Sequence, residues 1–258
     1  ARESPEQLAI GFRGTRLTYA ELLVAARNIA TTLHDAGVSP GDRVALALPK
    51  GLEAVASVYA ASLLGAAYVP LELRWPETRL RDVVKVARPA VLLCRPQEQA
   101  WLNQEVGEIC HTMVPVIEVE ESWLRESSSP VLSDPSLPAY VLFTSGSTGE
   151  PKGVVHTQSS VMNFAGWAAQ HLHLRPGDRL SGHAHLSFDL STFDLFAALH
   201  AGASVWPIPE SVMFRSALLR RFIQEHRLTI WYSVPRLWDL MTEDTLPAAP
   251  LTLSLIHI

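Results

Sequence analysis

The chain has 258 residues, of which 48% are hydrophobic and 18% are charged, and its formal net charge is -5. This length and apolar content suit one large domain or two smaller ones with a substantial core. The slightly acidic balance gives no electrostatic footprint for nucleic acid or an anionic membrane, and the apolar runs are too short or too interrupted to span a bilayer. Cys94 and Cys110 stand at no metal or redox spacing, so we expect a reduced, cytoplasmic protein.

Strand and helix signals alternate along the first part of the chain. Thr18 and Glu21 form a capping box, and apolar residues at helical spacing follow it until Gly37. The pattern then predicts a strand, a helix, a strand, a helix and a strand, over residues 43–48, 51–65, 67–71, 76–86 and 90–94. Residues 95–138 are more polar and read as irregular.

The alternation resumes at Ala139, and the sequence shows no internal repeat. Strands are predicted over residues 139–143, 179–187, 203–208 and 229–234, and helices over 159–171, 191–202 and 216–226. Such alternation is typical of an α/β fold, so we expect parallel-rich sheets flanked by helices.

The stretch TSGSTGEPKG, residues 144–153, directly follows a predicted buried strand. Glycines let the backbone approach a ligand, and successive N–H groups in such a turn form an anion-binding concavity. Hydroxyl donors and one lysine suit phosphate oxygens, although the spacing is not that of a Walker A loop. A surface linker is the disfavoured alternative. The predicted phosphate-binding residues are Thr144, Ser145, Gly146, Ser147, Thr148, Gly149 and Lys152.

The stretch LFTSGSTGEPKGVV resembles the signature of the adenylate-forming (AMP-binding) superfamily, which includes acyl-CoA ligases, luciferases and the adenylation domains of nonribosomal peptide synthetases. Stretches at residues 17–33, 62–73 and 188–196 resemble further motifs in family order, and the similarity extends to about Leu251. The resemblance implies the N-terminal portion of an adenylation domain that uses ATP and Mg²⁺. A carboxylate would attack the α-phosphate of ATP, pyrophosphate would leave, and a thiol would then take the acyl group.

Asp189 is the residue that distinguishes subfamilies in this resemblance. It stands in an apolar setting between Phe188 and Leu190, where a carboxylate needs a cationic partner, and it equally suits the N-cap of the following helix. The resemblance implies that Asp189 binds the α-ammonium of an amino acid, and that Leu190, Phe193 and Tyr232 line the side-chain pocket. Core packing is the alternative for those three. Uncharged, partly aromatic walls favour a compact apolar substrate. These four residues, together with the stretch WYSVP, are similar to those of free-standing enzymes that load L-proline onto a peptidyl carrier protein, so the resemblance makes L-proline the first candidate, with cysteine and other small apolar amino acids left open.

We therefore predict activation of an amino acid to aminoacyl-AMP, followed by thioester formation on the phosphopantetheine arm of a peptidyl carrier protein, with neither nucleic acid nor membrane as partner. The alternatives are an acyl- or aryl-CoA ligase, and an inactive nucleotide-binding fragment.

We expect residues 1–258 to be a truncated N-terminal core. The family's catalytic lysine and metal-binding glutamate lie outside it, so we predict no catalytic or metal-binding residue here and little activity for the chain alone. The final LSLIHI, residues 253–258, matches the translation of a transposon-end sequencing adapter, and we hypothesise that it is an artefact.

Overall fold

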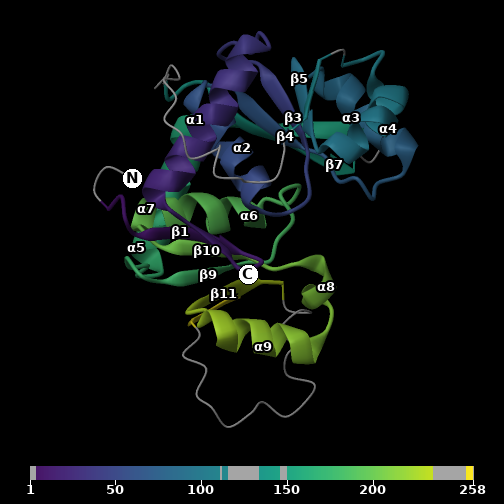
Figure 1. The fold of residues 1–258 in the computed structure, drawn as a ribbon. Helices are drawn as coiled ribbons and strands as arrows, with labels where there is room; N and C mark the ends of the chain where they lie inside the picture. The colour runs from purple at the N-terminus through teal and green to yellow at the C-terminus, as the bar shows by residue number, and fades with distance from the viewer. Residues whose placement is uncertain (1–3, 111, 116–133, 146–149, 235–253, 258) are drawn as a thin grey trace. The chain divides into compact units, whose positions relative to one another are not determined.

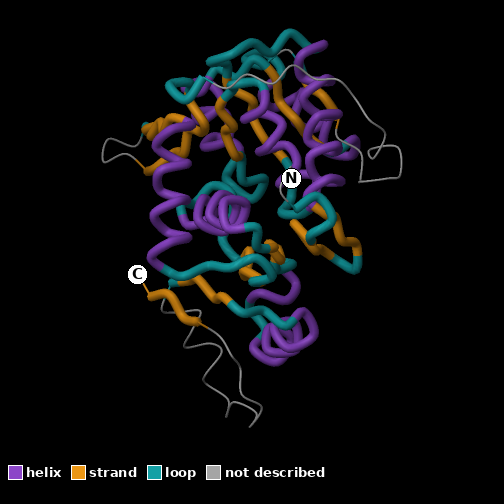
Figure 2. The backbone as a smooth tube through the Cα atoms, turned by 90° about the vertical axis from the view of Figure 1, so that its left-hand side faces the viewer, coloured by secondary structure: helices purple, strands orange, loops and turns teal. Residues whose placement is uncertain are grey.

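The computed structural model describes residues 4–110, 112–115, 134–145, 150–234 and 254–257. The chain divides into two compact units. The central unit is Glu21–Val161, and the terminal unit combines Ala1–Ala20 with Met162–Ile258. Helices and strands alternate along both (Figure 1, Figure 2).

The central unit is built on a mixed sheet of six strands in the order β6-β5-β3-β4-β7-β8. Neighbouring strands are parallel except for the edge pair β7–β8, which is antiparallel. The strands are β3 (Arg43–Ala47), β4 (Ala67–Pro70), β5 (Val91–Cys94), β6 (Met113–Pro115), β7 (Pro138–Ser145) and β8 (Pro151–Thr157).

Helices cover the parallel part of this sheet. They are α1 (Tyr19–Asp35), α2 (Leu52–Leu63), α3 (Glu77–Ala87) and α4 (Pro96–Val106). Strand β5 is an unbroken apolar run that is buried along its whole length, as a strand of a parallel sheet covered on both faces should be. Leu80, Val83 and Leu102 bring α3 and α4 onto one face, beside β5 in Figure 1. Burying each such side chain stabilises the fold by roughly 1.5–3 kcal/mol relative to exposure.

The terminal unit has a second six-stranded mixed sheet, in the order β12-β11-β9-β10-β1-β2. Again every neighbouring pair is parallel except one edge pair, β1–β2. The strands are β1 (Leu8–Phe12), β2 (Thr15–Thr18), β9 (Arg179–Gly182), β10 (Ser204–Pro207), β11 (Ile230–Ser233) and β12 (Ser254–His257).

The terminal unit contains several helical segments: α5 (Gln158–His171), α6 (Leu190–Thr192), the π-helical turn η2 (Phe193–Ala197), α7 (Ala198–Ala201), α8 (Glu210–Met213) and α9 (Ser216–His226). Those that follow β9 connect its parallel strands, whereas α5 leads from β8 into β9. Helix α9 packs Leu219 and Ile223 against Trp206 and Trp231 of the sheet. The Tyr19 hydroxyl donates to the carbonyl oxygen of Ala203 at 2.6 Å, which ties the end of β2 to the start of β10.

The sheets of the two units have the same strand topology, although the sequence shows no internal repeat. In the central sheet β3 lies third and β4 fourth, and β9 and β10 hold the same two places in the terminal sheet. An antiparallel hairpin forms the last two strands of each sheet, β7–β8 in one and β1–β2 in the other. Helix α2 connects β3 to β4, and the segment α6–η2–α7 connects β9 to β10 in the same place of that topology. Equivalent connections therefore carry different sequences.

The α/β expectation is confirmed, and the predicted helices and most strands are present within a few residues. The elements that were missed are the β1–β2 hairpin, helix α4 and strand β6 inside the segment read as irregular, strand β8, and the short helix α8. The predicted strand over 179–187 is too long, because β9 ends at Gly182. The Gly182 carbonyl oxygen still accepts from the Ile208 N–H at 3.0 Å, and the chain then turns where the Ser187 N–H donates to Nδ1 of His185.

Candidate functional site

The β7–β8 hairpin holds both ends of the predicted phosphate loop. Thr144 pairs with Lys152 and Ser145 pairs with Pro151 across the antiparallel ladder. The Thr144 hydroxyl donates to the Lys152 carbonyl oxygen at 3.5 Å. Gly146, Ser147, Thr148 and Gly149 lie outside the described residues. The structure therefore brings three of the predicted phosphate-binding residues, Thr144, Ser145 and Lys152, to one end of one hairpin.

Gly153 has a packing role that the sequence analysis did not assign. A Cβ atom at this position would lie 2.8 Å from Cγ1 of Val141 and 3.2 Å from Cζ of Phe143, both on β7. Only glycine lets β8 approach β7 this closely beside Lys152. The Pro-Lys-Gly sequence thus begins a strand rather than continuing a loop.

Aromatic rings support the base of the hairpin. Tyr68 of β4 pairs with Tyr140 of β7, with ring centroids 5.6 Å apart, and Tyr140 contacts His156 of β8 at 5.2 Å. Tyr68 is fully buried, and burial raises the pKa of its phenol far above the usual value. No sequence pattern singled out this row, because its members come from three strands.

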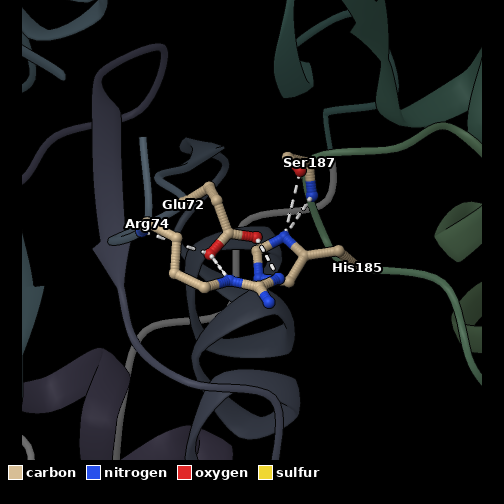
Figure 3. Close-up of polar contacts among 4 residues, drawn as sticks. All are labelled: Glu72, Arg74, His185 and Ser187. Carbon is tan, nitrogen blue, oxygen red and sulfur yellow. Dashed lines mark hydrogen bonds and ion pairs between the residues drawn. The ribbon is translucent and has the colours of Figure 1, made fainter. Parts of the chain in front are cut away.

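Short polar contacts shape the turns that follow β4 and β9 (Figure 3). After β4, the Arg74 guanidinium binds the Glu72 carboxylate, with Nε 3.2 Å from Oε1. After β9, the Ser187 backbone N–H donates to Nδ1 of His185 at 3.3 Å, and the Ser187 hydroxyl lies 3.0 Å from the same atom. The contacts between His185 and Ser187 replace the strand pairing that the sequence predicted for residues 183–187.

Asp189 occupies the N-cap position of α6. Its Oδ1 accepts a hydrogen bond from the Leu190 N–H at 2.9 Å, and its carbonyl oxygen accepts from the Thr192 hydroxyl at 2.6 Å. The residue is exposed, and neighbouring Phe188 is 60% exposed. The expected apolar setting for this carboxylate is therefore wrong, and the capping alternative describes its contacts. An exposed carboxylate with an N–H partner can still accept a ligand's ammonium group.

Phe193 and Tyr232 meet, as residues of a common pocket wall would. Phe193 in η2 is buried, and its ring centroid lies 4.3 Å from that of Tyr232 in β11, with the ring planes tilted by 42°. Burial raises the pKa of the Tyr232 phenol, and the negative charges of Asp194 and Asp189 raise it further. Leu190, at the start of α6, is half-buried. Of the four predicted substrate residues, Phe193 and Tyr232 are thus in direct contact across two elements.

Asp178 has a structural role in the terminal unit. Its Oδ2 accepts from the Arg175 N–H at 2.7 Å, and its Oδ1 accepts from the Thr229 hydroxyl at 2.8 Å. These bonds join the turn before β9 to the segment that enters β11.

No group of three or more His, Cys, Asp or Glu among the described residues is placed to hold a metal ion. Within the same residues, no helix has both the length and the apolar character needed to cross a membrane.

Comparisons with known proteins agree on one family. The model named AMP-binding enzyme matches residues 1–255. An L-proline–[L-prolyl-carrier protein] ligase from Streptomyces coelicolor is 37% identical over 243 residues, and one from Pseudomonas fluorescens is 34% identical over 249 residues. The matches cover 88% and 93% of this chain but 46% and 49% of those proteins, so the chain spans about half the length of these relatives.

A solved structure agrees in fold and sequence. The nonribosomal peptide synthetase FmoA3, in its AMPPNP-bound form, matches with a TM-score of 0.81 at 31% identity, over 93% of this chain and 25% of that chain.

Proposed function

The chain belongs to the family of AMP-binding enzymes, and on that premise we propose that the protein carrying it activates an amino acid with ATP. The amino acid carboxylate attacks the α-phosphorus, the bond from that phosphorus to the bridging oxygen breaks, and pyrophosphate leaves. The aminoacyl-AMP then passes its acyl group to a phosphopantetheine thiol on a peptidyl carrier protein, and AMP is released. The observation that carries the proposal is the β7–β8 hairpin, whose paired ends hold a loop of hydroxyls, glycines and a lysine.

The hairpin would act on the leaving group. Lys152 stands at the start of β8, opposite Thr144, so its ammonium is anchored at one end of the loop. Charge builds on pyrophosphate as it departs, and donors that are already in place stabilise that charge without reorganisation. The predicted donors to the β- and γ-phosphates are Thr144, Ser145, Gly146, Ser147, Thr148, Gly149 and Lys152.

We propose Mg²⁺ as the companion of ATP. The predicted phosphate-binding residues offer hydroxyl, amide and ammonium donors and no carboxylate or imidazole, which fits them to phosphate oxygens rather than to the metal. Mg²⁺ usually keeps several waters and is held largely by the phosphates, and it would neutralise charge on the pyrophosphate. Thr148 and Lys152 would then hold the pyrophosphate oxygens that the metal leaves exposed.

Asp189 would select substrates that carry an ammonium group. At about 4 Å and an effective dielectric constant of 20, opposite charges attract by about 4 kcal/mol before desolvation. Asp189 is exposed, so solvent screening reduces that figure. What remains still discriminates an amino acid from an acid of the same shape without the amine.

The contact between Phe193 and Tyr232 supports a compact apolar side chain. Two aromatic rings 4.3 Å apart form one continuous surface and leave no room between them. No charged group lies in this pair to receive a long cationic or anionic side chain. We propose L-proline as the substrate, which also agrees with the names of the two ligases to which the chain is similar.

We place the protein in the reducing cytoplasm, where the carrier protein is also made. Both cysteines, Cys94 and Cys110, are buried thiols that form no disulfide.

The proposal is tested by amino-acid-dependent exchange between ATP and labelled pyrophosphate, measured on the complete protein that carries these residues. We expect exchange with L-proline above a panel of the other amino acids. Asp189→Ala should lower kcat/KM for proline by at least about tenfold, because a charge-assisted contact is lost. Glu210→Ala, which removes a carboxylate from another turn of the same unit, should leave exchange unchanged.

Two outcomes would contradict this function. Exchange that depends on a carboxylic acid without an amine, and that survives Asp189→Ala, would instead indicate a CoA ligase. Binding of ATP without exchange for any acid would indicate a nucleotide-binding protein.

A further inference from the structure

Two rows of side chains cross strands β4, β7 and β8 on one face of the central sheet. The first row is Tyr68, Tyr140 and His156, which pair across the strands and whose rings are in contact. Side chains alternate between the two faces of a strand, so a position four residues further along points to the same face. The second row is therefore found four residues from the first in each strand.

The second row consists of Glu72, Thr144 and Lys152. Thr144 pairs with Lys152 across the β7–β8 hairpin. Strands β4 and β7 run parallel, with Tyr68 opposite Tyr140. Four residues on, Glu72 therefore stands level with Thr144, just after β4 ends. Neighbouring strands lie about 4.8 Å apart, which places Glu72 beside the start of the predicted phosphate loop.

The packing on the opposite face supports this register. One hydrophobic cluster contains the residues that the register makes level with one another, Val69 with Val141 and Leu71 with Phe143. The Leu71 N–H also donates to the Leu46 carbonyl oxygen of β3 at 2.9 Å. The chain after β4 thus continues along the sheet to the residue before the second row.

The turn after β4 pairs the Glu72 carboxylate with a guanidinium. Nε of Arg74 lies 3.2 Å from Oε1 of Glu72, and Nη2 lies 3.4 Å from Oε2 (Figure 3). The Arg74 backbone N–H also donates to Oε1 at 3.4 Å. The Trp75 N–H closes the turn by donating to the Glu72 carbonyl oxygen at 2.9 Å. A lone carboxylate at this place would repel phosphate, and the ion pair offsets its charge.

Exposure distinguishes the two partners of this ion pair. The Glu72 side chain is 14% exposed, whereas that of Arg74 is 62% exposed. The carboxylate is thus largely covered, and the guanidinium faces solvent at the carboxyl end of parallel strands, which is where open α/β sheets bind their ligands. A guanidinium presents five N–H donors in a planar fork that suits phosphate oxygens as well as carboxylates.

We propose that Arg74 is a second cationic contact for the β- and γ-phosphates of ATP, and that Glu72 holds it in place. Lys152 lies on one side of Thr144, and the Glu72–Arg74 pair lies on the other. The terminal phosphates then lie between an ammonium from β8 and a guanidinium from the turn after β4, so charge on the departing pyrophosphate is stabilised from two sides. This inference rests on the proposed function, because it needs ATP at the hairpin.

The test compares the affinities for ATP and AMP, measured by titration calorimetry on the complete protein that carries these residues. Arg74→Gln should weaken ATP binding by about tenfold, because a charge-assisted contact with the phosphates is lost. AMP has no β- or γ-phosphate, so its affinity should change by less than about twofold. A general distortion of the nucleotide site would weaken the binding of both.

A second ion pair of the central unit provides the matched control. Nη2 of Arg81 in α3 lies 2.8 Å from Oε2 of Glu105 in α4, and the two side chains are 53% and 8% exposed. Arg81→Gln should therefore leave both affinities unchanged. Arg74→Lys keeps the charge but loses the planar fork, so ATP binding should weaken by only about threefold.

A double variant tests the place of Glu72. Arg74→Gln removes a cation from the Glu72 carboxylate and so exposes the phosphates to its charge. Glu72→Gln combined with Arg74→Gln removes that repulsion as well, and the double variant should bind ATP about threefold more tightly than Arg74→Gln alone. Equal ATP affinities of these two variants would show that Glu72 does not lie beside the phosphates, and would overturn the inference.

Two further results would also overturn it. Unchanged ATP affinity in Arg74→Gln would remove Arg74 from the site, and equal weakening for ATP and AMP would indicate a general structural role. Should Arg74→Gln not fold, Arg74→Lys decides alone, and unchanged ATP affinity in that variant rejects the inference. A wild type that does not bind ATP refutes the proposed function instead, whereas a wild type that binds ATP no more tightly than Arg74→Gln refutes only this inference.

Discussion

The edge hairpins of the two sheets each join two antiparallel strands, but the connecting loops differ in length. In the terminal unit, β1 and β2 are joined by Arg13 and Gly14, with φ of 48° and 90°. Two residues of positive φ are what the shortest hairpin connections use. In the central unit, β7 and β8 are joined by the five residues of GSTGE, 146–150. Closing a hairpin therefore does not account for the length or the hydroxyls of the second loop, whereas the proposed phosphate binding would.

The first connections of the two sheets differ in the same sense. Helix α2 is apolar and regular, whereas η2 contains a buried carboxylate and a π-helical turn. In each unit, one of the two features departs from the simplest solution: the long connection between β7 and β8 in the central unit, and η2 in the terminal unit. Regions that break local rules at some cost are where function is expected.

The largest effect is expected when both hairpins are given the same two-residue turn. Residues 146–150 are replaced by Asn-Gly, and Pro151→Thr restores the N–H that a two-residue turn needs. We expect a folded protein whose unfolding free energy stays within about 1 kcal/mol of the wild type, since loop length affects closure weakly. ATP binding, measured by titration calorimetry, should be lost.

A loop of unchanged length provides the matched control. Ser147→Ala with Thr148→Ala keeps the glycines and the backbone donors, so we expect weakened but measurable ATP binding. ATP binding by the two-residue variant would show that the loop is a connection only.

The next effect in size concerns Lys152 alone. Lys152→Ala removes the single cation of the hairpin, and we expect pyrophosphate exchange to fall about a hundredfold, as when one preorganised donor to a developing charge is lost. Lys85→Ala on the exposed face of α3 is the control and should leave exchange unchanged. Equal rates for the Lys152 and Lys85 variants would remove Lys152 from the site.

The sequence predicted most accurately those elements whose formation depends on a pattern within one short segment of the chain. Periodic apolar faces revealed the long helices α1, α5 and α9, and continuous apolar runs revealed β3 and β5. Strand β8 escaped because its Pro and Gly are loop residues by propensity. They are accommodated by an edge position and by close contact with Val141. Helix α4 escaped because it buries only Leu102 and Val106 and shows little periodicity.

The candidate site was predictable in chemistry but not in environment. Hydroxyls, glycines and a lysine in one stretch indicated phosphate binding before any geometry was known. The exposure of Asp189 depends on how the segment after β9 turns, which no local pattern encodes. The contact between Phe193 and Tyr232 joins residues far apart along the chain, which no local pattern encodes.

Glycines within the strands of the two hairpins can be compared by how much their substitution lowers the free energy of unfolding. A Cβ at Gly11 of β1 would lie 2.5 Å from the ring of Trp206, which is buried and fixed in β10. Gly11→Ala should therefore destabilise the protein by about 2–3 kcal/mol through overpacking. Gly153→Ala meets Cγ1 of Val141 at 2.8 Å, but strand β8 is an exposed edge strand that can shift away, so the change should cost about 1 kcal/mol. Urea unfolding followed by circular dichroism measures both, and the reverse order would contradict the packing argument.

The smallest predicted effect isolates the turn of the β1–β2 hairpin. No atom lies within 4 Å of where a Cβ at Gly14 would be, so only its positive φ resists substitution. Gly14→Ala should cost about 1 kcal/mol of unfolding free energy, and Gly14→Asn less, because asparagine adopts this region more readily. The same urea titration measures both variants. Equal stabilities for glycine and alanine would mean that positive φ does not close this turn, and the contrast with residues 146–150 would lose its reference.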